Sequence, residues 1–298
     1  MQSENCILCP HKCNVNRAER RGRCGVSGEN IRVGRASLHL WEEPCISGKN
    51  GSGTVFFSGC NLGCVYCQNA ELSQKYAGKD ITVEQLANTM LALQEKGAHN
   101  INLVTPTHYS AQICSAIHIA KSKGLHIPLV YNTSGYETVE AIRSLKGLVS
   151  VYLTDFKYAD DVLAMRYSKV SDYFGVAFEA LNEMFLQVGA PKFDDKGMML
   201  SGVIVRHLVL PGQLQNTKDV LKTVYDKFGD KVIFSIMNQY TPIGKLPYQE
   251  LNRKLQPQEY DEVIDYALSI GITNAFIQEE GTQQESYIPV FNGEGICG

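Results

Sequence analysis

From residue 54 onward, short runs of apolar residues alternate with longer segments in which apolar residues recur at the period of a helix. The apolar runs are TVFFSGC, NINLVTP, IPLVYNTSG, VSVYLTDF, GVIVRHLVLPG, KVIFSIMNQY and the short NAFIQ. Strands that are apolar almost throughout are typical of a parallel sheet that helices cover on both faces. The alternation therefore predicts an α/β fold.

Helices are predicted between these runs, at residues 83–97, 110–124, 138–147, 217–229 and 257–271. The first has Thr82 as its N-cap and Gly97 as its stop signal. About six strand–helix units fit between residues 54 and 240, which is fewer than the eight of a closed α/β barrel. We predict a partial (β/α)6 barrel of parallel strands, with a flat doubly wound sheet as the alternative.

Polar residues follow almost every predicted strand. They are the cysteine loop from Cys60, then Thr105 to His108, Asn132 to Gly135, Asp155 to Lys157, Arg206 with Pro211-Gly212, and Asn238 to Tyr240. Ligands bind at the carboxyl ends of the strands in both candidate folds. The repetition favours a functional pocket there, although strand ends are often polar simply because they lead into loops.

Composition narrows the function. The chain has 298 residues, 44% of them hydrophobic, which is enough for one large domain with a small appendage. A net charge of −3 gives no general attraction for nucleic acid. No long apolar run predicts a membrane span, and the start lacks the pattern of a signal peptide. We expect a cytoplasmic protein, with an N-terminal segment at 1–48 and the barrel with a C-terminal extension at 49–298.

Seven of the ten cysteines fall in two clusters, which predicts metal binding, since disulfides are rare in the cytoplasm. Cys60, Cys64 and Cys67 have the spacing C-x3-C-x2-C. Three thiolates bind zinc together with a ligand from elsewhere, or three irons of a four-iron cluster. In the cluster one iron stays open, and a ligand with an amino and a carboxylate group could chelate it.

The second cluster lies near the N-terminus and has the spacing C-x2-C-x3-C-x10-C. Its members are Cys6, Cys9, Cys13 and Cys24. Four thiolates at this spacing fit either a closed structural zinc site or an auxiliary iron–sulfur cluster. We favour zinc, because tight turns suit a closed, four-coordinate site.

The C-x3-C-x2-C loop at the end of the first barrel strand resembles the signature of the radical SAM superfamily. Further motifs are similar to the pyruvate formate-lyase activating enzyme group over roughly residues 50 to 240. CVYCQN matches at Tyr66, Cys67 and Asn69, NTSG at 132–135 resembles DTNG, TDFKY resembles DLK, and VRHLVLPG resembles the R…PG motif.

The resemblance implies a [4Fe-4S] cluster on Cys60, Cys64 and Cys67, and S-adenosylmethionine (SAM) chelating its open iron. Reductive cleavage of SAM would give a 5′-deoxyadenosyl radical that abstracts hydrogen from a substrate. An electron donor such as flavodoxin or ferredoxin and a protein or peptide substrate are the implied partners. The positions expected to contact SAM are Tyr66, Gln68, Asn69, Thr105, Thr107, Asn132, Ser134, Asp155, Lys157 and Arg206. No catalytic side chain is assigned.

The chain departs from the pattern in three places. Gln68 replaces the histidine usual in the activating enzyme. The second strand usually ends in a Gly-Gly-Glu that meets the amino group of SAM, whereas residues 106–108 are Pro-Thr-His, so that contact must differ. The histidine usual at the sixth strand is missing, and residues 238–240 are the candidates to replace it.

Three functions are compatible with these motifs. The first is an activase that abstracts hydrogen from a glycine of a partner enzyme, and the second is radical chemistry on a small molecule or peptide. The third, a metal-binding protein without catalysis, is disfavoured by the open-iron spacing. A polar segment at residues 276–291 is expected to be a solvated loop or a lid over the pocket.

Overall fold

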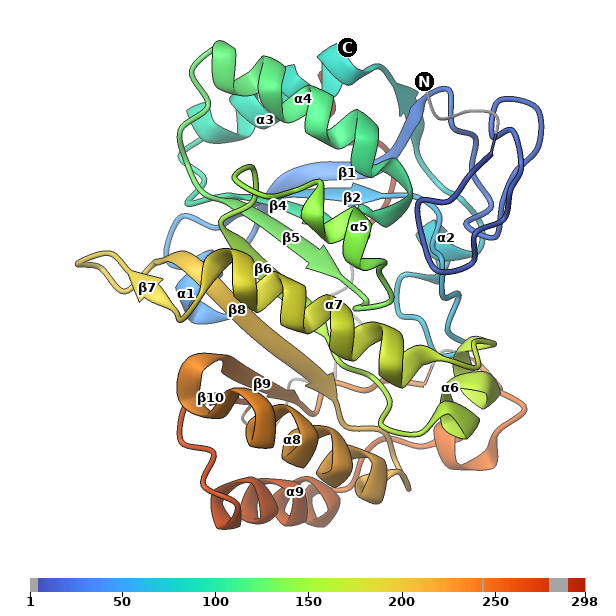
Figure 1. The fold of residues 1–298 in the computed structure, drawn as a ribbon, viewed down its shortest axis with the longest axis vertical. Coiled ribbons are helices and arrows are strands. Elements are labelled where there is room, and N and C mark those ends of the chain that lie inside the picture. The colour runs from blue at the N-terminus through green and yellow to red at the C-terminus, as the bar shows by residue number, and fades with distance from the viewer. Residues whose placement is uncertain (1–4, 243, 279–288, 298) are drawn as a thin grey trace.

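The computed structural model describes residues 5–242, 244–278 and 289–297. Figure 1 shows its ribbon. The strands are β1 (Ile31–His39), β2 (Ser52–Phe57), β3 (Lys79–Ile81), β4 (Ile101–Val104), β5 (Leu129–Thr133), β6 (Val151–Asp155), β7 (Lys192–Phe193), β8 (Met199–Leu208), β9 (Ile233–Met237) and β10 (Ala275–Ile277). The α-helices are α1 (Pro44–Ser47), α2 (Ala70–Ser73), α3 (Val83–Glu95), α4 (Ser110–Ser122), α5 (Val139–Arg143), α6 (Asp161–Ser168), α7 (Tyr173–Val188), α8 (Leu214–Phe228) and α9 (Pro257–Ser269).

The strands form one sheet in the order β10-β9-β8-β6-β5-β4-β2-β1-β3, and β7 pairs with β8. The strands from β10 to β2 in this order run parallel, whereas β1 is antiparallel to both β2 and β3. The sheet does not close, because β10 and β3 remain at its two ends. The predicted partial barrel of parallel strands is confirmed, and all seven parallel strands coincide with predicted apolar runs.

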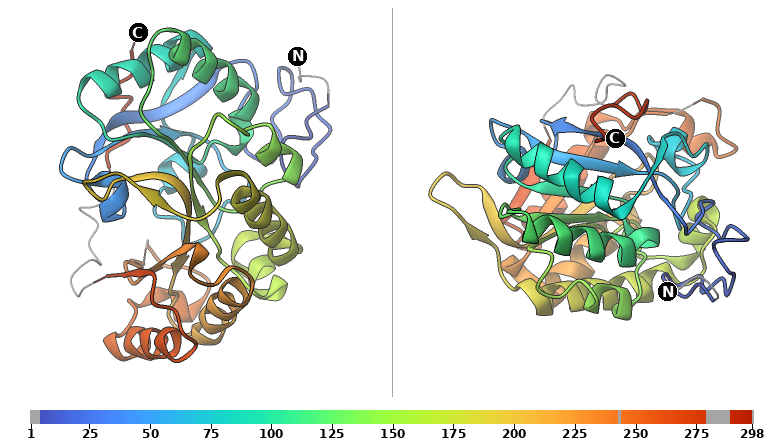
Figure 2. Two further views of the ribbon diagram at one scale, coloured as in Figure 1. Left: turned by 60° about the vertical axis from the view of Figure 1, so that its left-hand side comes forward. Right: turned by 90° about the horizontal axis from the view of Figure 1, so that it is seen from above.

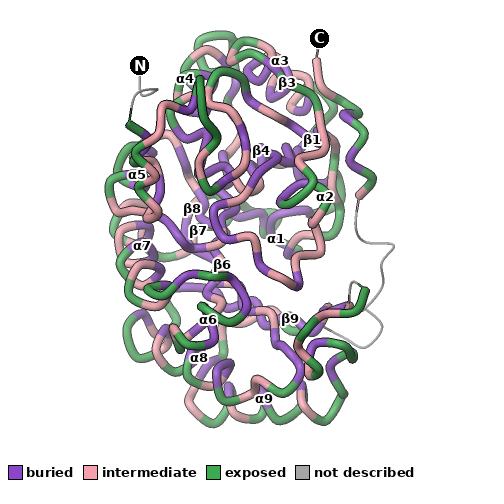
Figure 3. Tube along the Cα trace, turned by 90° about the vertical axis from the view of Figure 1, so that its right-hand side faces the viewer, coloured by how far each residue is buried: buried purple, intermediate pink, exposed green. Residues whose placement is uncertain are grey.

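Helices cover the outer face of this sheet, as the two further views in Figure 2 show. Helix α3 begins where predicted, because the Thr82 hydroxyl accepts from the backbone N–H of Gln85 and the Gln85 side chain accepts from that of Thr82. Its buried face, which includes Leu86, Met90 and Leu93, covers the β1–β2–β4 side of the sheet. In Figure 3 the central strands β4 and β6 are mostly buried, whereas exposed positions are frequent along the helices.

Several elements were not predicted from the sequence. Helices α6 and α7 occupy the long stretch between β6 and β8, for which no helix was predicted. Strand β1 lies within the segment 1–48 and pairs with β2 along most of its length. Of the polar segment expected to be a loop or lid, residues 279–288 lie outside the described residues. No helix among the described residues is long and apolar enough to cross a membrane.

Candidate active site

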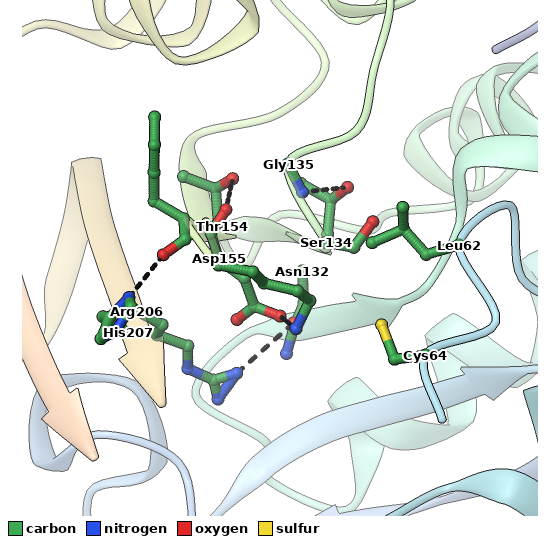
Figure 4. Close-up of polar contacts among 12 residues, drawn as sticks. Leu62, Cys64, Asn132, Ser134, Gly135, Thr154, Asp155, Arg206 and His207 are labelled. Carbon is green, nitrogen blue, oxygen red and sulfur yellow. Dashed lines mark hydrogen bonds and ion pairs between the residues drawn. The ribbon is translucent and has the colours of Figure 1, made fainter. Parts of the chain in front are cut away.

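A cavity of about 260 Å³ opens at the carboxyl edge of the sheet. Its walls come from the strand ends of β2, β4, β5, β6, β8 and β9, the cysteine loop that follows β2, and the segment after β1. Strand register explains the convergence: Phe56, Val104 and Asn132 are aligned on neighbouring strands, and Asp155 is aligned with Arg206. Figure 4 shows Asn132, Asp155 and Arg206 close together, with Cys64 on the facing loop.

Most of the predicted site residues line this one cavity. They are Cys60, Cys64, Cys67, Tyr66, Gln68, Asn69, Thr105, Asn132, Ser134, Asp155, Lys157 and Arg206. Thr107 does not line it, because its side chain is buried and donates to Glu137 at 2.6 Å. Gln68 connects the cysteine loop to the end of β9 by donating to the carbonyl oxygen of Gln239 at 2.9 Å.

Each sulfur of the cysteine loop accepts a hydrogen bond. Cys64 accepts from the Ser168 hydroxyl at 3.0 Å, Cys67 from Ser73 at 3.2 Å, and Cys60 from the backbone N–H of residue 62 at 3.4 Å. Burial raises the pKa of Cys60 to about 12 and also raises that of Cys67. If these cysteines ligate a metal as thiolates, the hydrogen-bond donors and the positive charge of the metal would stabilise the ionised form.

The three thiols of the cysteine loop are suited to a four-iron cluster. Among the described residues, no three His, Cys, Asp or Glu side chains are grouped so that they could hold one metal ion. A four-iron cluster binds each cysteine through a different iron, so its ligands need not converge on one point. Three thiols facing one cavity from a single loop suit such a cluster, and the cavity beside them leaves room for a ligand.

A hydrogen-bonded chain links the cysteine loop to the aromatic wall of the cavity. The Ser168 hydroxyl, which donates to Cys64, is 2.7 Å from the Tyr158 hydroxyl, and this lies 2.8 Å from the Tyr66 hydroxyl. The Tyr66 ring makes edge contacts with the rings of Tyr167 and Tyr240. Sequence analysis did not identify Ser168, which belongs to no motif at a strand end. Tyr158 ends the TDFKY motif, but the resemblance assigned roles only to Asp155 and Lys157.

The two cations of the cavity are already paired. Arg206 donates through Nε to Glu43 at 3.0 Å and through a terminal nitrogen to Glu42. Lys157 contacts Asp155 at 2.6 Å. Burial opposes both positive charges, but the neighbouring carboxylates outweigh it and hold the pKa values of Arg206 and Lys157 above their ordinary values.

Glu42 and Glu43 were missed in the sequence because they follow an unpredicted strand and carry no motif. The Glu42 carboxylate also accepts from Asn102 at 2.9 Å and from Asn132 at 3.5 Å. Glu42, Glu43 and Arg206 together carry one net negative charge when ionised. The wall formed by β4, β5 and β8 is therefore more acidic than the strand-end motifs suggested.

The N-terminal cysteines lie against the cysteine loop of the cavity. Cys6, Cys9 and Cys24 are buried, and Cys13 is partly exposed. The carbonyl oxygen of Cys24 accepts from the backbone N–H of Cys60 at 3.3 Å. Gly59 is required at this approach: its φ is 91°, and a Cβ there would lie 2.7 Å from the Cys24 carbonyl oxygen.

Glu137 is a buried carboxyl group that contacts Thr133 at the end of β5 and lies near Cys9 of the N-terminal segment. One oxygen accepts from Thr107 and Thr133 at 2.6 Å each, and the other has no hydrogen-bond partner among the described residues. Burial raises its pKa to about 7 against these stabilising donors. Glu137 also raises the pKa of Cys9, after the larger effect of burial.

Comparisons with known proteins relate this chain to one superfamily. A family model described as the radical SAM superfamily matches residues 54–192. The uncharacterized protein MJ0674 of Methanocaldococcus jannaschii is 32% identical over 274 residues, which cover 89% of this chain and 74% of that protein. The pyruvate formate-lyase-activating enzyme of Clostridium pasteurianum is 29% identical over 112 residues, covering 36% of this chain and 46% of that enzyme.

Among solved structures, Streptococcus suis SuiB bound to S-adenosylmethionine matches with a TM-score of 0.52 at 14% identity, over 75% of this chain and 49% of SuiB. SuiB bound to the precursor peptide SuiA matches with a TM-score of 0.51 at 14% identity, over 75% of this chain and 47% of the SuiB chain. This chain spans about half the length of SuiB, and at this identity the likeness shows the fold alone.

The open parallel sheet, with the cysteine loop and the cavity at its carboxyl edge, fits the superfamily that the family model names, and that superfamily consists of radical-type enzymes. This chain belongs to the radical SAM superfamily.

Proposed function

We propose that this chain cleaves SAM reductively and uses the resulting 5′-deoxyadenosyl radical to abstract a hydrogen atom from a substrate. One observation carries the proposal. Three cysteines with hydrogen-bonded sulfurs and nine residues expected to contact SAM line the same cavity. Cys60, Cys64 and Cys67 would hold the [4Fe-4S] cluster, which when bound supplies the electron for cleavage.

The protein's own side chains bind and orient the reactants. Tyr66, held by its contacts with Tyr167 and Tyr240, offers an aromatic wall for the adenine. Asp155 suits the ribose hydroxyls or the sulfonium, and Lys157 beside it suits a carboxylate. Walls drawn from six strand ends and the cysteine loop would limit the access of water to a reactive radical.

For the substrate, we propose a glycine in a partner protein, as in an activase. The partial similarity to a pyruvate formate-lyase-activating enzyme supports this choice. Radical modification of a small molecule or a peptide is the alternative. A non-catalytic metal-binding role is weaker, because it gives no reason for the cavity to gather these residues at six strand ends.

An external one-electron donor such as flavodoxin or ferredoxin completes the scheme, because cleavage of SAM consumes one electron.

We also propose that Cys6, Cys9, Cys13 and Cys24 bind a metal centre. The chemistry of four thiols is compatible with zinc, which the sequence favoured, and with iron–sulfur. We favour zinc, because four thiolates on a tight segment suit a closed, four-coordinate site.

The test is anaerobic reconstitution with iron and sulfide, followed by dithionite and SAM. We expect formation of 5′-deoxyadenosine, measured by chromatography, and none without reductant. Addition of a candidate glycyl radical enzyme should then give a glycyl doublet in the EPR spectrum. Cleavage of SAM without a doublet from any candidate would favour the small-molecule or peptide reading, and absence of cleavage would overturn the proposal.

A further inference from the structure

We propose that the hydroxyls of Ser168 and Tyr158 raise the reduction potential of the iron–sulfur cluster that Cys64 would help to hold. Ser168 acts on the sulfur directly, and Tyr158 is a positioning residue that acts through Ser168. This inference rests on the proposed function, because it concerns the cluster of the same cavity. Neither Ser168 nor Tyr158 lines the cavity, so the role proposed for them is not contact with SAM or with a substrate.

The end of helix α6 is held against the cysteine loop. Ser168 is the last residue of α6, and Lys169 ends the helix in a left-handed backbone conformation with a φ of 59°. The backbone N–H of Val65 donates to the carbonyl oxygen of Tyr167 at 2.9 Å. Because this bond joins the neighbours of Cys64 and Ser168, it fixes the two segments where the Ser168 hydroxyl donates to the Cys64 sulfur at 3.0 Å.

The protons of the hydroxyl chain have one consistent arrangement. A cysteine that ligates iron is a thiolate without a proton, so the single proton of the Ser168 hydroxyl is used on Cys64. The Ser168 oxygen then accepts from Tyr158 at 2.7 Å, and the Tyr158 oxygen accepts from Tyr66 at 2.8 Å. Three hydroxyl dipoles therefore point from Tyr66 toward the sulfur, and each one polarises the next.

Burial strengthens the effect of this chain on the sulfur. Ser168 and Tyr158 are fully buried, and Cys64 and Tyr66 are buried as well. Burial raises the pKa of Tyr158 well above its ordinary value, so the phenol keeps the proton that it donates. A donor in such a dry setting acts on a neighbouring charge more strongly than it would in solvent.

A donor to a cluster sulfur favours the reduced state of the cluster. Reduction adds one negative charge, and hydrogen bonds to the ligand sulfurs stabilise that charge. The corresponding contact of Ser73 with Cys67 is longer, at 3.2 Å, and no second hydroxyl stands behind it in the part of the chain that the structure describes. We therefore expect Ser168 to have the larger effect, which would make the cluster easier for an external electron donor to reduce.

Two other serines provide matched controls. Ser73→Ala removes a hydroxyl donor from another cysteine of the same loop, but no chain of hydroxyls. Ser52→Ala removes a buried hydroxyl that donates to Asn100 at 2.6 Å, at the opposite end of β2 from the cysteine loop. The second control shows what the loss of a buried serine hydrogen bond does when no cluster sulfur is involved.

The experiment is a redox titration of the reconstituted protein without SAM, followed by the EPR signal of the reduced cluster. The signal that counts is the part lost when Cys60, Cys64 and Cys67 are all replaced by serine, so a second metal centre does not contribute. In Ser168→Ala the ratio of reduced to oxidised cluster at a fixed potential should fall about three- to ten-fold. A ten-fold fall corresponds to a shift of about 59 mV toward negative potential for a one-electron couple. Ser73→Ala should shift the potential less in the same direction, and Ser52→Ala should leave it unchanged.

Tyr158→Phe tests the chain behind the serine. The variant keeps the ring but loses the donor to Ser168, so the potential should become more negative by less than in Ser168→Ala. Because Tyr158 acts through Ser168, the double variant should have the potential of Ser168→Ala alone.

The outcomes separate this inference from the proposed function. The inference is overturned if Ser168→Ala has the potential of wild type, or if Ser52→Ala shifts the potential as much as Ser168→Ala does. Additive shifts in the double variant would overturn the positioning role of Tyr158. Absence of the cluster signal from wild type itself would instead overturn the proposed function.

Discussion

The backbone N–H of Cys60 donates to the carbonyl oxygen of Cys24 at 3.3 Å, which joins the cysteine loop of the cavity to the N-terminal cysteine segment. Two side chains strengthen the connection. His11 lies 2.7 Å from the carbonyl oxygen of Asn61, and Arg23 donates to that of Leu62 at 3.2 Å. The N-terminal segment therefore supports the loop that we expect to hold the radical SAM cluster.

His11→Ala should loosen this support without removing a cysteine. A lost hydrogen bond of this kind is worth about 1 kcal/mol, and the ring also makes an edge contact with Tyr136. We expect the reconstituted cluster to form but to be lost several-fold faster to a chelator, measured by its visible absorbance. Arg20→Ala, an exposed position on the same segment, is the control. Equal rates in the two variants would contradict a supporting role.

Replacing Cys60, Cys64 and Cys67 by serine should abolish the radical chemistry, because a hydroxyl is a poor ligand for iron in such a cluster. We expect loss of the absorbance that belongs to this cluster and no 5′-deoxyadenosine under dithionite. Cys114→Ser, a change outside both cysteine clusters, should leave both signals intact. Production of 5′-deoxyadenosine by the triple serine variant would show that the central assignment is wrong.

The same triple serine variant tests the N-terminal centre. With the first cluster removed, metal bound by Cys6, Cys9, Cys13 and Cys24 is measured alone. We expect about four irons per chain if the centre is a cluster, and about one zinc if it is a single-ion site. Elemental analysis after anaerobic purification distinguishes the two. A variant with neither metal would show that these thiols form no metal centre.

The parallel part of the fold could be predicted because each strand is buried on both faces and is therefore a short apolar run. Strand β1 escaped prediction because it lies in the antiparallel part of the sheet, where a strand can carry polar residues on one face, and Arg32, Arg35 and Ser37 interrupt its apolar pattern. Helix α7 escaped because it is apolar on much of its surface, with Phe174, Phe178 and Phe185 packed against the core.

The site shows a similar division. Motifs at strand ends predicted nine cavity residues, because parallel strands bring their carboxyl ends to one edge. Glu42 and Glu43 could not be predicted in this way, since they reach Arg206 from more than 160 residues away through the tertiary fold. Thr107, two residues beyond Thr105, points away from the cavity because the chain turns into a 3-10 helix at 107–109.

Arg206→Ala should destabilise the fold as well as alter ligand binding. The change leaves Glu42 and Glu43 buried without their shared cation, and breaking a buried pair in this way costs about 3–5 kcal/mol. Urea unfolding at neutral pH measures the loss. Arg143→Ala, which removes an ion pair with a 63% exposed arginine, should cost no more than about 1 kcal/mol.

A companion variant separates charge from packing. Arg206→Ala combined with Glu42→Gln and Glu43→Gln removes the uncompensated charges, so part of the lost free energy of unfolding should return. If the triple variant is no more stable than Arg206→Ala, the loss comes from packing around the arginine and not from buried charge.

SAM affinity, measured by cluster EPR, should fall in Arg206→Ala about ten-fold if the guanidinium also meets the SAM carboxylate.

Glu137 should make the free energy of unfolding depend on pH between about 4.5 and 7. Burial raises its pKa in the folded protein from 4.5 to about 7, so in this window the folded state holds a proton that the unfolded state has released. The unfolded state then binds fewer protons, and the free energy of unfolding must fall as pH rises. The greatest slope from one such group is about 1.4 kcal/mol per pH unit.

Glu137→Gln should remove that contribution to the slope, because glutamine does not titrate. Urea unfolding at several pH values from 5 to 8 gives the free energy of unfolding of wild type and variant. The difference between these two free energies should level off above about pH 7, where Glu137 is ionised in both the folded and the unfolded state. Glu259→Gln is the control: the pKa of Glu259 is lowered to about 2, chiefly by its hydrogen bond with Arg253, so it is already ionised throughout this range. A slope unchanged in Glu137→Gln would mean that Glu137 remains ionised in the folded protein, with its second oxygen bound by a donor such as water.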